Sequence, residues 1–311
     1  MTCDVHSRPH RSIATGCALA GLLVAGALPG SAWAGSPINK RTAADPQGTV
    51  EVSNVAGTVT VTGWDRNEVE VTGELGDGTE KLEFTKSNKL TRVRVVVPNR
   101  AYNVDDTDLI VRIPVASVLS INTVSADVTV NGVLGAQRLQ TVSGDVRTEA
   151  GGEDVECRTV SGDVLVNGNG SGRKGLVSIT TVSGDATATK VAGEVNGNTV
   201  SGTFVLGVGE ITRSRLRSTS GDVGLTGQLA RDARLDIESI SGDVRVDLVG
   251  STAGQYEVSS FNGEIRNCFG PKSVRTNEYA PGRELRFQDG DGSARVRIKT
   301  LNGDIGVCRK K

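Results

Sequence analysis

An acidic residue recurs at one position of a short repeated motif, and a row of carboxylates is a candidate ligand set for a metal ion. The fullest copies of the motif read Thr-Val-Ser-Gly-Asp-Val, as at residues 141–146. If successive copies stack as neighbouring strands, their carboxylates lie about 4.8 Å apart and repel one another. Ca²⁺ binds about six to eight oxygen atoms and would offset that repulsion. The acidic residues at this position are Asp127, Asp145, Asp163, Asp185, Asp222, Asp243, Glu264 and Asp304.

A structural role for these carboxylates is the interpretation we favour. An aspartate beside a glycine readily accepts a backbone N–H bond at its own turn while facing water. Calcium-binding repeats carry denser runs of Gly and Asp than this motif does. Thr203 also interrupts the row without supplying a substitute ligand. We therefore expect no bound metal and no other cofactor.

The sequence argues against nucleophilic catalysis, because the predicted mature chain lacks histidine, the commonest general base of such sites. The only histidines, His6 and His10, lie in the N-terminal segment that we interpret below as a signal peptide. Without histidine, neither a Ser-His-Asp nor a Cys-His site can form, and zinc loses its commonest nitrogen ligand. We expect the repeated serines to occupy turns for conformational reasons, so the sequence predicts no catalytic residue.

A carbohydrate-active enzyme on a β-helix is the alternative, because such enzymes need only carboxylates and basic side chains. Arg147, Arg245 and Arg266 each lie four residues after the motif's serine position and could line a groove together with aspartates. A solvated charged face explains the same residues more simply. A deep groove with clustered Asp and Arg would favour the enzyme, whereas flat charged faces would favour a binding module.

The period of the motif predicts the elements that carry these residues. Most successive copies are separated by 18 to 22 residues, and self-similarity at this period is typical of stacked supersecondary units. The motif's first position is occupied by Ala56, Ser125, Ser143, Ser161, Ser183, Ser201, Ser220, Ser241, Asn262 and Asn302. Four copies define the repeat corner: Ser143, Gly144, Asp145; Ser161, Gly162, Asp163; Ser183, Gly184, Asp185; and Ser241, Gly242, Asp243.

The apolar pattern changes phase across the Ser-Gly pair. In one copy, Cys157 and Thr159 precede Ser161, whereas Val164 and Val166 follow it. Side chains alternate faces along a strand, so these two sets cannot share a face unless the chain bends between them. Glycine tolerates the positive φ of such a corner, and Asn is a reasonable replacement for serine. A β-solenoid satisfies this pattern, and so does a series of two-residue hairpins.

We favour the solenoid because the apolar pattern keeps the same phase relative to the Ser-Gly pair in successive copies. These copies differ in length only in the segments between motifs. The predicted fold is all-β: a single-stranded, parallel β-helix-like solenoid of ~20-residue coils. The irregular strand-like runs between Trp64 and Ser120 predict a β cap at the N-terminal end. Between Asn262 and Asn302, residues Glu284 to Ile298 read as two strands joined at Asp-Gly.

Two cysteines occupy equivalent places in the last two copies. Cys268 and Cys308 each lie six residues after the corner position, which predicts a disulfide in an oxidising compartment. Equal positions on adjacent coils are about 4.8 Å apart, within the range that a disulfide accepts. The hairpin interpretation of Glu284 to Ile298 would leave these two coils adjacent. Cys157 replaces an Ile or Leu of other copies and is predicted to be a buried thiol.

The N-terminus reads as a secretory signal peptide. A basic start precedes a short apolar run, and Ala32 and Ala34 flank Trp33 at a predicted cleavage position after Ala34. We therefore expect a signal peptide at 1–34, an extension at 35–47 and a repeat domain at 48–311. The protein is expected to be exported to the periplasm or cell envelope, or secreted, and not to span a membrane. Its formal net charge of −1 argues against a nucleic-acid partner.

From about Gly48 to its end, the sequence resembles the putative adhesin β-strand repeat family of bacteria, whose module is called the toastrack domain. The resemblance depends on the reiterated "VSGDV", the opening "VSNVAGTVTVTGW" and the closing "RVRIKTLNGDIGV". It implies a right-handed β-helix-like fold and envelope association, with links to envelope stress or surface contact. It supplies no catalytic residue. The partner we expect is an unidentified envelope protein or glycan, bound by a non-enzymatic scaffold or binding module.

Overall fold

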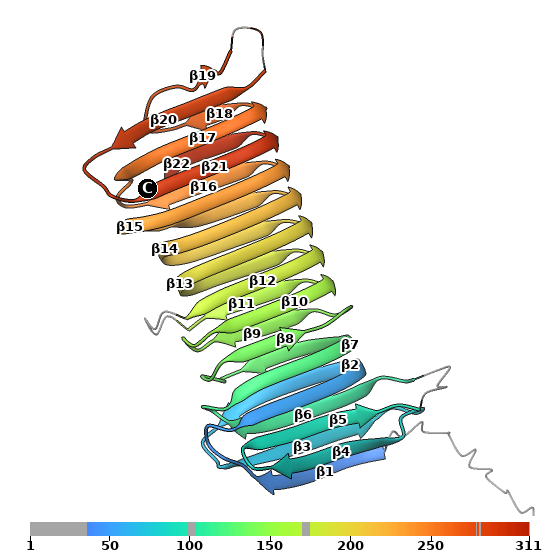
Figure 1. The fold of residues 1–311 in the computed structure, drawn as a ribbon. Helices are drawn as coiled ribbons and strands as arrows, with labels where there is room; N and C mark the ends of the chain where they lie inside the picture. Colours follow the sequence, from blue (N-terminus) through green and yellow to red (C-terminus); the bar gives the residue numbers. More distant parts are fainter. Residues whose placement is uncertain (1–35, 99–103, 170–174, 278, 280, 311) are drawn as a thin grey trace, which may run out of the picture. The chain divides into compact units, whose positions relative to one another are not determined.

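The computed structural model describes residues 36–98, 104–169, 175–277, 279 and 281–310, and these residues form strands joined by turns (Figure 1). The predicted signal peptide lies outside the described residues. No helix capable of spanning a membrane occurs in the part of the chain that is described. Each central coil has a first arm before the Ser-Gly corner and a second arm after it. In one coil these arms are β10 (Val155–Ser161) and β11 (Val164–Gly168).

Neighbouring coils pair in parallel, which confirms the solenoid and excludes a series of hairpins. β10 pairs in parallel with β12 (Leu176–Ser183), and Ser161 aligns with Ser183. In the next pair of coils Ser183 aligns with Ser201, so the corners stack on one another. The remaining strands of the central stack are β7 (Val118–Asn131), β8 (Gln137–Gln140), β9 (Val146–Ala150), β13 (Ala186–Ser201), β14 (Phe204–Ser220), β15 (Val223–Ser241) and β16 (Val244–Val249).

The core follows from the phase change at the corner. In the coil of β10 and β11, Cys157, Thr159, Val164 and Val166 are all buried, so the bend directs both apolar sets inward. Stacking repeats this arrangement, and each coil covers the apolar interior of the next. The result is one continuous core made mainly of Val, Ile, Leu and Ala side chains.

The first coil in the sequence is not the end of the stack. β2 (Thr49–Trp64) pairs with β7 on one side and with β5 (Leu90–Val96) and β6 (Thr107–Pro114) on the other. Antiparallel pairs cover that outer layer: β4 (Lys81–Ser87) on β5, β3 (Glu68–Leu75) on β6, and β1 (Ser36–Ala43) on β3. The segment expected to be an extension therefore contributes a strand to the sheet.

Glu70 joins three strands of this N-terminal layer. Its side chain is only 8% exposed and accepts hydrogen bonds from Arg41 on β1 and from Arg112 Nη1 on β6, the latter at 2.8 Å. The hydrogen bond from Arg41 is the main cause that holds the pKa of Glu70 below its ordinary value, and Arg112 adds to it.

We expect Glu70→Gln to destabilise the protein near neutral pH and to have little effect in acid. A carboxyl whose pKa is lowered by folding contributes stability above its unfolded pKa of about 4.3, and this is lost as the pH falls through the folded pKa. Denaturation of wild type and variant at a series of pH values measures the difference. A gap between the two proteins that persists at the acidic end would contradict this role for Glu70.

The C-terminal coil is inserted into the stack. β21 (Arg295–Asn302) pairs in parallel with both β15 and β17 (Gly254–Asn262), and β22 (Ile305–Lys310) pairs with both β16 and β18 (Ile265–Asn267). The outermost coil is therefore that of β17 and β18, although β21 and β22 follow it in the sequence. Figure 1 shows β21 and β22, in red, between the orange strands.

The expected hairpin of Glu284 to Ile298 is wrong. β20 (Arg283–Asp289) pairs antiparallel with the outer edge of β17 and with β19 (Val274–Arg275), whereas β21 lies on the opposite side of β17. After β20 the chain turns at Asp289 to Gly292 and returns as β21 on the opposite side of β17. Tyr256 of β17 stacks on Phe287 of β20 with ring centroids 4.6 Å apart, which holds this antiparallel strand over the end of the core.

Candidate functional site

The corner glycines form a column in which backbones touch. A Cβ added at Gly162 would lie 2.2 Å from the carbonyl oxygen of Gly144, and one at Gly184 would lie 2.2 Å from that of Gly162. Each corner N–H also bonds across the stack, as from Gly144 to the Ser161 oxygen at 3.2 Å. The expected reason for glycine, a positive φ, applies at Gly242 (φ 138°) but not at Gly144 or Gly162. There, close backbone approach excludes a side chain.

The carboxylates of the repeated acidic position accept backbone N–H groups from the next coil, not from their own corner as expected. Asp163 N–H donates to Asp145 Oδ1 at 3.0 Å, and Asp185 N–H donates to Asp163 Oδ1 at 2.8 Å. The pattern continues to Thr203, whose N–H donates to Asp185. Thr203 has no carboxylate to extend it, and the pattern resumes at Asp222. This use of the carboxylates is structural, and the described residues contain no group of three or more His, Cys, Asp or Glu arranged to hold a metal ion.

We expect Asp243→Ala to lower the free energy of unfolding by about 1 kcal/mol, because it removes the acceptor for Asp304 N–H. Asp243→Asn is the matched control: its amide oxygen can accept the same bond, so its stability should stay close to wild type. Denaturant unfolding of the three proteins, with and without Ca²⁺, measures both effects. A large loss in the Asn variant together with stabilisation of wild type by Ca²⁺ would instead indicate a metal site.

The arginines that could have lined a catalytic groove are not brought together. Arg147 aligns with Leu165 on the next coil, whereas Arg245 and Arg266 flank Gly306 at the other end of the central stack. Arg147 also pairs with Asp145, and Arg245 pairs with Asp247, each at 2.9 Å. In both pairs the arginine is exposed on a sheet face, and these three arginines do not form the groove that the enzyme alternative requires.

An exposed apolar row along the stack was missed by the sequence reasoning. The residue before each corner serine points outward, and in the coils of Val160 and Val182 it is 44% and 41% exposed. Because the corners are aligned, these side chains form one column across successive coils. The alternation of faces next to a buried Thr would have identified it. The other members that are large and exposed are Val124, Val142, Val200, Ile240, Leu301 and Phe261.

A shallow hollow of about 380 Å³ adjoins this row over β12 to β15. Val182, Val200 and Ile240 line it on one side, and Arg217 and Glu238 lie on the other. Thr219 replaces the apolar residue in one coil, so the row is not uniform. An apolar column beside polar and charged side chains is typical of a surface that binds another molecule.

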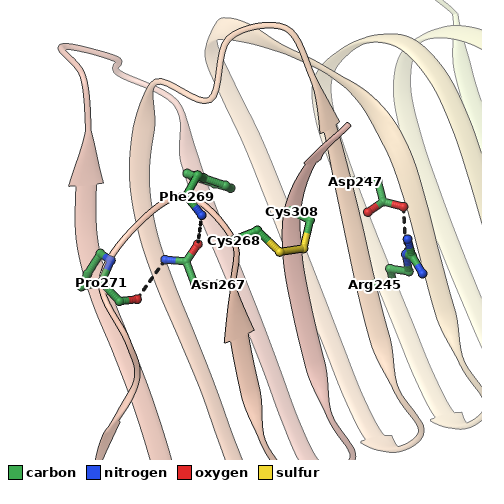
Figure 2. Close-up of a disulfide and its surroundings, with 7 residues drawn as sticks. All are labelled: Arg245, Asp247, Asn267, Cys268, Phe269, Pro271 and Cys308. Carbon is green, nitrogen blue, oxygen red and sulfur yellow. Dashed lines mark hydrogen bonds and ion pairs between the residues drawn. A yellow bond between two sulfur atoms is a disulfide. The ribbon is translucent and has the colours of Figure 1, made fainter. Parts of the chain in front are cut away.

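Cys268 and Cys308 form a disulfide between adjacent coils, with Cα atoms 4.8 Å apart (Figure 2). The pairing is the one that their equivalent positions predict, although strand insertion and not a hairpin makes the coils adjacent. Asn267 holds the turn that follows, donating to the Pro271 oxygen and accepting from Phe269 N–H. The free thiol of Cys157 is fully buried, and burial raises its pKa to about 12, so it is unsuited to reaction.

The Toastrack DUF4097 family profile matches residues 41–308. No curated protein matches the chain. Among solved structures, one described as a putative lipid binding protein from Parabacteroides distasonis is 12% identical, with 89% of this chain and 98% of that chain covered and a TM-score of 0.47. A putative adhesin from Bacteroides fragilis is 11% identical, with 87% and 96% covered and a TM-score of 0.41. At such similarity neither structure indicates a ligand for this chain.

Proposed function

Because the chain belongs to the Toastrack DUF4097 family, we propose that it is an exported, non-enzymatic binding module of the cell envelope, which presents a repetitive solenoid face to an envelope protein or glycan. A role in the response to envelope stress is part of this proposal. The carbohydrate-active enzyme is the alternative. An enzyme needs reactive side chains clustered on the outer face, whereas a binding module needs only rows of exposed side chains there.

The exposed apolar row is the observation that carries the proposal. Side chains such as Val160, Val182 and Ile240 lie outside the core, and each is more than two-fifths exposed. The core does not need them, because the positions on either side of each corner already fill it. Soluble proteins rarely expose large contiguous apolar patches, so an apolar column that is interrupted at Thr219 and otherwise follows the corners supports a binding role.

The double variant Val160→Asp, Val182→Asp tests this role. We expect it to lose binding to isolated envelopes while its melting temperature stays close to wild type, because both residues face outward. Val205→Asp is the control, since Val205 is 43% exposed but lies on a second arm, away from the row. Co-sedimentation of purified protein with envelopes measures binding. Equal loss in the row variant and the control, or no loss in either, would overturn the assignment of the row as the binding surface.

Export makes a separate prediction. We expect the protein recovered from cells to begin at Gly35, because the segment before it has a basic start, an apolar run and small residues at the cleavage position. Mass spectrometry of the intact protein and of its N-terminal peptide measures this. Protein that retains Met1 in every cell fraction would contradict export.

A further inference from the structure

Three arginines on adjacent strands lie in one register. Arg213 on β14 aligns with Arg234 on β15, and Arg234 aligns with Arg295 on β21. We call Arg213, Arg234 and Arg295 the arginine column. All three side chains are exposed, on strands that lie side by side in Figure 1. Neighbouring strands are about 4.8 Å apart, and like charges directly opposite one another destabilise a sheet.

The neighbouring positions of the same strands avoid this repulsion. Two residues further along, Arg215, Asp236, Arg297 and Glu257 follow one another across the stack with alternating charge. Arg215 lies 3.9 Å from Asp236, and Arg297 lies 3.8 Å from Glu257. The coils therefore accommodate opposite charges in register, and nothing in the fold requires three arginines in a column.

Only one member of the column has a carboxylate partner among the described residues. Arg213 forms an ion pair with Glu194 at 2.7 Å, whereas neither Arg234 nor Arg295 lies within ion-pair distance of an acidic side chain that the structure describes. A shallow groove of about 580 Å³ runs over the column, with Arg215, Arg297 and Asp236 also in its lining. A second groove of about 650 Å³ begins at Arg295 and Arg297 and continues past Arg286.

The insertion of the C-terminal coil creates the column. In chain order the coil after Arg234 carries Gln255, which would be its neighbour in an uninterrupted stack. Because β21 lies between β15 and β17, Arg295 lies between Arg234 and Gln255 and adds a third positive charge to the line. The protein as a whole has a formal net charge of −1, so this concentration of arginine is local.

We propose that the arginine column binds a carboxylate-bearing polysaccharide lying along the stack. The inference rests on the proposed function, because it names the ligand class of that binding module. A guanidinium binds a carboxylate through two parallel hydrogen bonds, and an added anion relieves the repulsion between Arg234 and its neighbours. Neighbouring strands are about 4.8 Å apart, so an extended acidic chain that runs along the stack passes over all three guanidinium groups, and its uronate groups can reach them.

The groove fits an acidic glycan better than a nucleic acid. Its lining includes the carboxylates of Glu194 and Asp236, which can accept hydrogen bonds from the hydroxyl groups of a sugar. The lining contains no aromatic side chain on which a base could stack.

Titration with polygalacturonate oligomers tests the site, using the full protein purified from cells. We expect wild type to bind and Arg234→Gln, Arg295→Gln to lose about tenfold or more in affinity, since two charge-assisted contacts are removed. The control is Arg266→Gln, because Arg266 is an exposed arginine of the second arm. It should change affinity by less than about twofold. Equal losses in both variants would show charge attraction alone and overturn the site, as would equal binding of neutral dextran. Tighter binding of a DNA strand of equal charge would overturn the ligand class.

The melting temperature gives a second readout that a purely structural arginine would not produce. Without polymer, Arg234→Gln should melt higher than wild type because it removes a charge from between two like charges. With polymer, wild type should gain stability by ligand binding, and the variant should gain much less. A lower melting temperature for Arg234→Gln in the absence of polymer would contradict the unrelieved repulsion on which the inference depends.

The two proposals fail in different ways. If polygalacturonate does not bind but the Val160→Asp, Val182→Asp variant still loses envelope binding, the arginine site is wrong and the binding module remains. If polygalacturonate binds at the column but the row variant binds envelopes normally, the row is wrong and the arginine site remains. If the bound polymer is cleaved, the non-enzymatic function is wrong and the column belongs to an enzyme.

Discussion

Gly162→Val is expected to unfold at a temperature well below wild type, because it places a side chain between two stacked backbones. The added Cβ would lie 2.2 Å from the Gly144 oxygen and 2.7 Å from its carbonyl carbon, and neither atom can move without separating the coils. Overpacking of this kind costs about 3 kcal/mol or more. For a chain of this size, that corresponds to a fall in melting temperature of roughly 6 °C or more.

Gly224→Val is the matched control for this prediction. Gly224 lies on β15, and a Cβ added there meets nothing within 4 Å. Valine also suits a strand, so this variant should be as stable as wild type or slightly more stable. Thermal unfolding followed by circular dichroism compares the three proteins. If Gly162→Val melts with wild type, close contact between the corner backbones is not what excludes side chains from this column.

Removal of the disulfide is expected to have an effect of similar size. Cys268 and Cys308 close a loop of 40 residues, and a cross-link of this length stabilises a fold by about 4 kcal/mol, chiefly by restricting the unfolded chain. The bond joins the outermost coil, which contains β18, to the inserted coil, which contains β22. Its loss should therefore weaken the C-terminal end most, since the outer coil has no further coil beyond it.

The variant Cys268→Ser, Cys308→Ser and a reducing agent provide two routes to the same result. We expect faster hydrogen exchange in residues 254–267 and 295–310 of the variant, with little change in the central coils near Val164. Reducing agent should produce the same change in wild type and none in the variant. Unchanged exchange in wild type after reduction, with both thiols shown to be free, would contradict a stabilising bridge.

The features that recur in each copy of the motif could be predicted from the sequence. The position of the corner and the parallel stacking followed from the phase change between Thr159 and Val164 and from the regular spacing of Ser161, Ser183 and their equivalents. Residues such as Cys157 were predicted to be buried because their place in the motif is otherwise filled by large apolar side chains. Local pattern and period were sufficient for these features.

Other features depend on which coils become neighbours, and the order of the chain does not contain that information. Asp243 accepts from Asp304, a residue 61 positions away, because β22 inserts beside β16. The same insertion places Arg295 beside Arg234. The close approach of Gly162 to Gly144 likewise arises between coils, so at this position the sequence suggested a positive φ where the structure shows a steric limit.

An assay for turnover tests most directly whether this solenoid binds its partner without transforming it. Purified protein is incubated with envelope polysaccharides and with polygalacturonate, and new reducing ends and unsaturated uronates are measured over time. We predict no release above a heat-inactivated control, because the recurring carboxylates hold neighbouring coils together and the carboxylates beside the arginine column, Glu194 and Asp236, are paired with Arg213 and Arg215. Reproducible cleavage that one Asp→Asn substitution abolishes without loss of stability would contradict the claim.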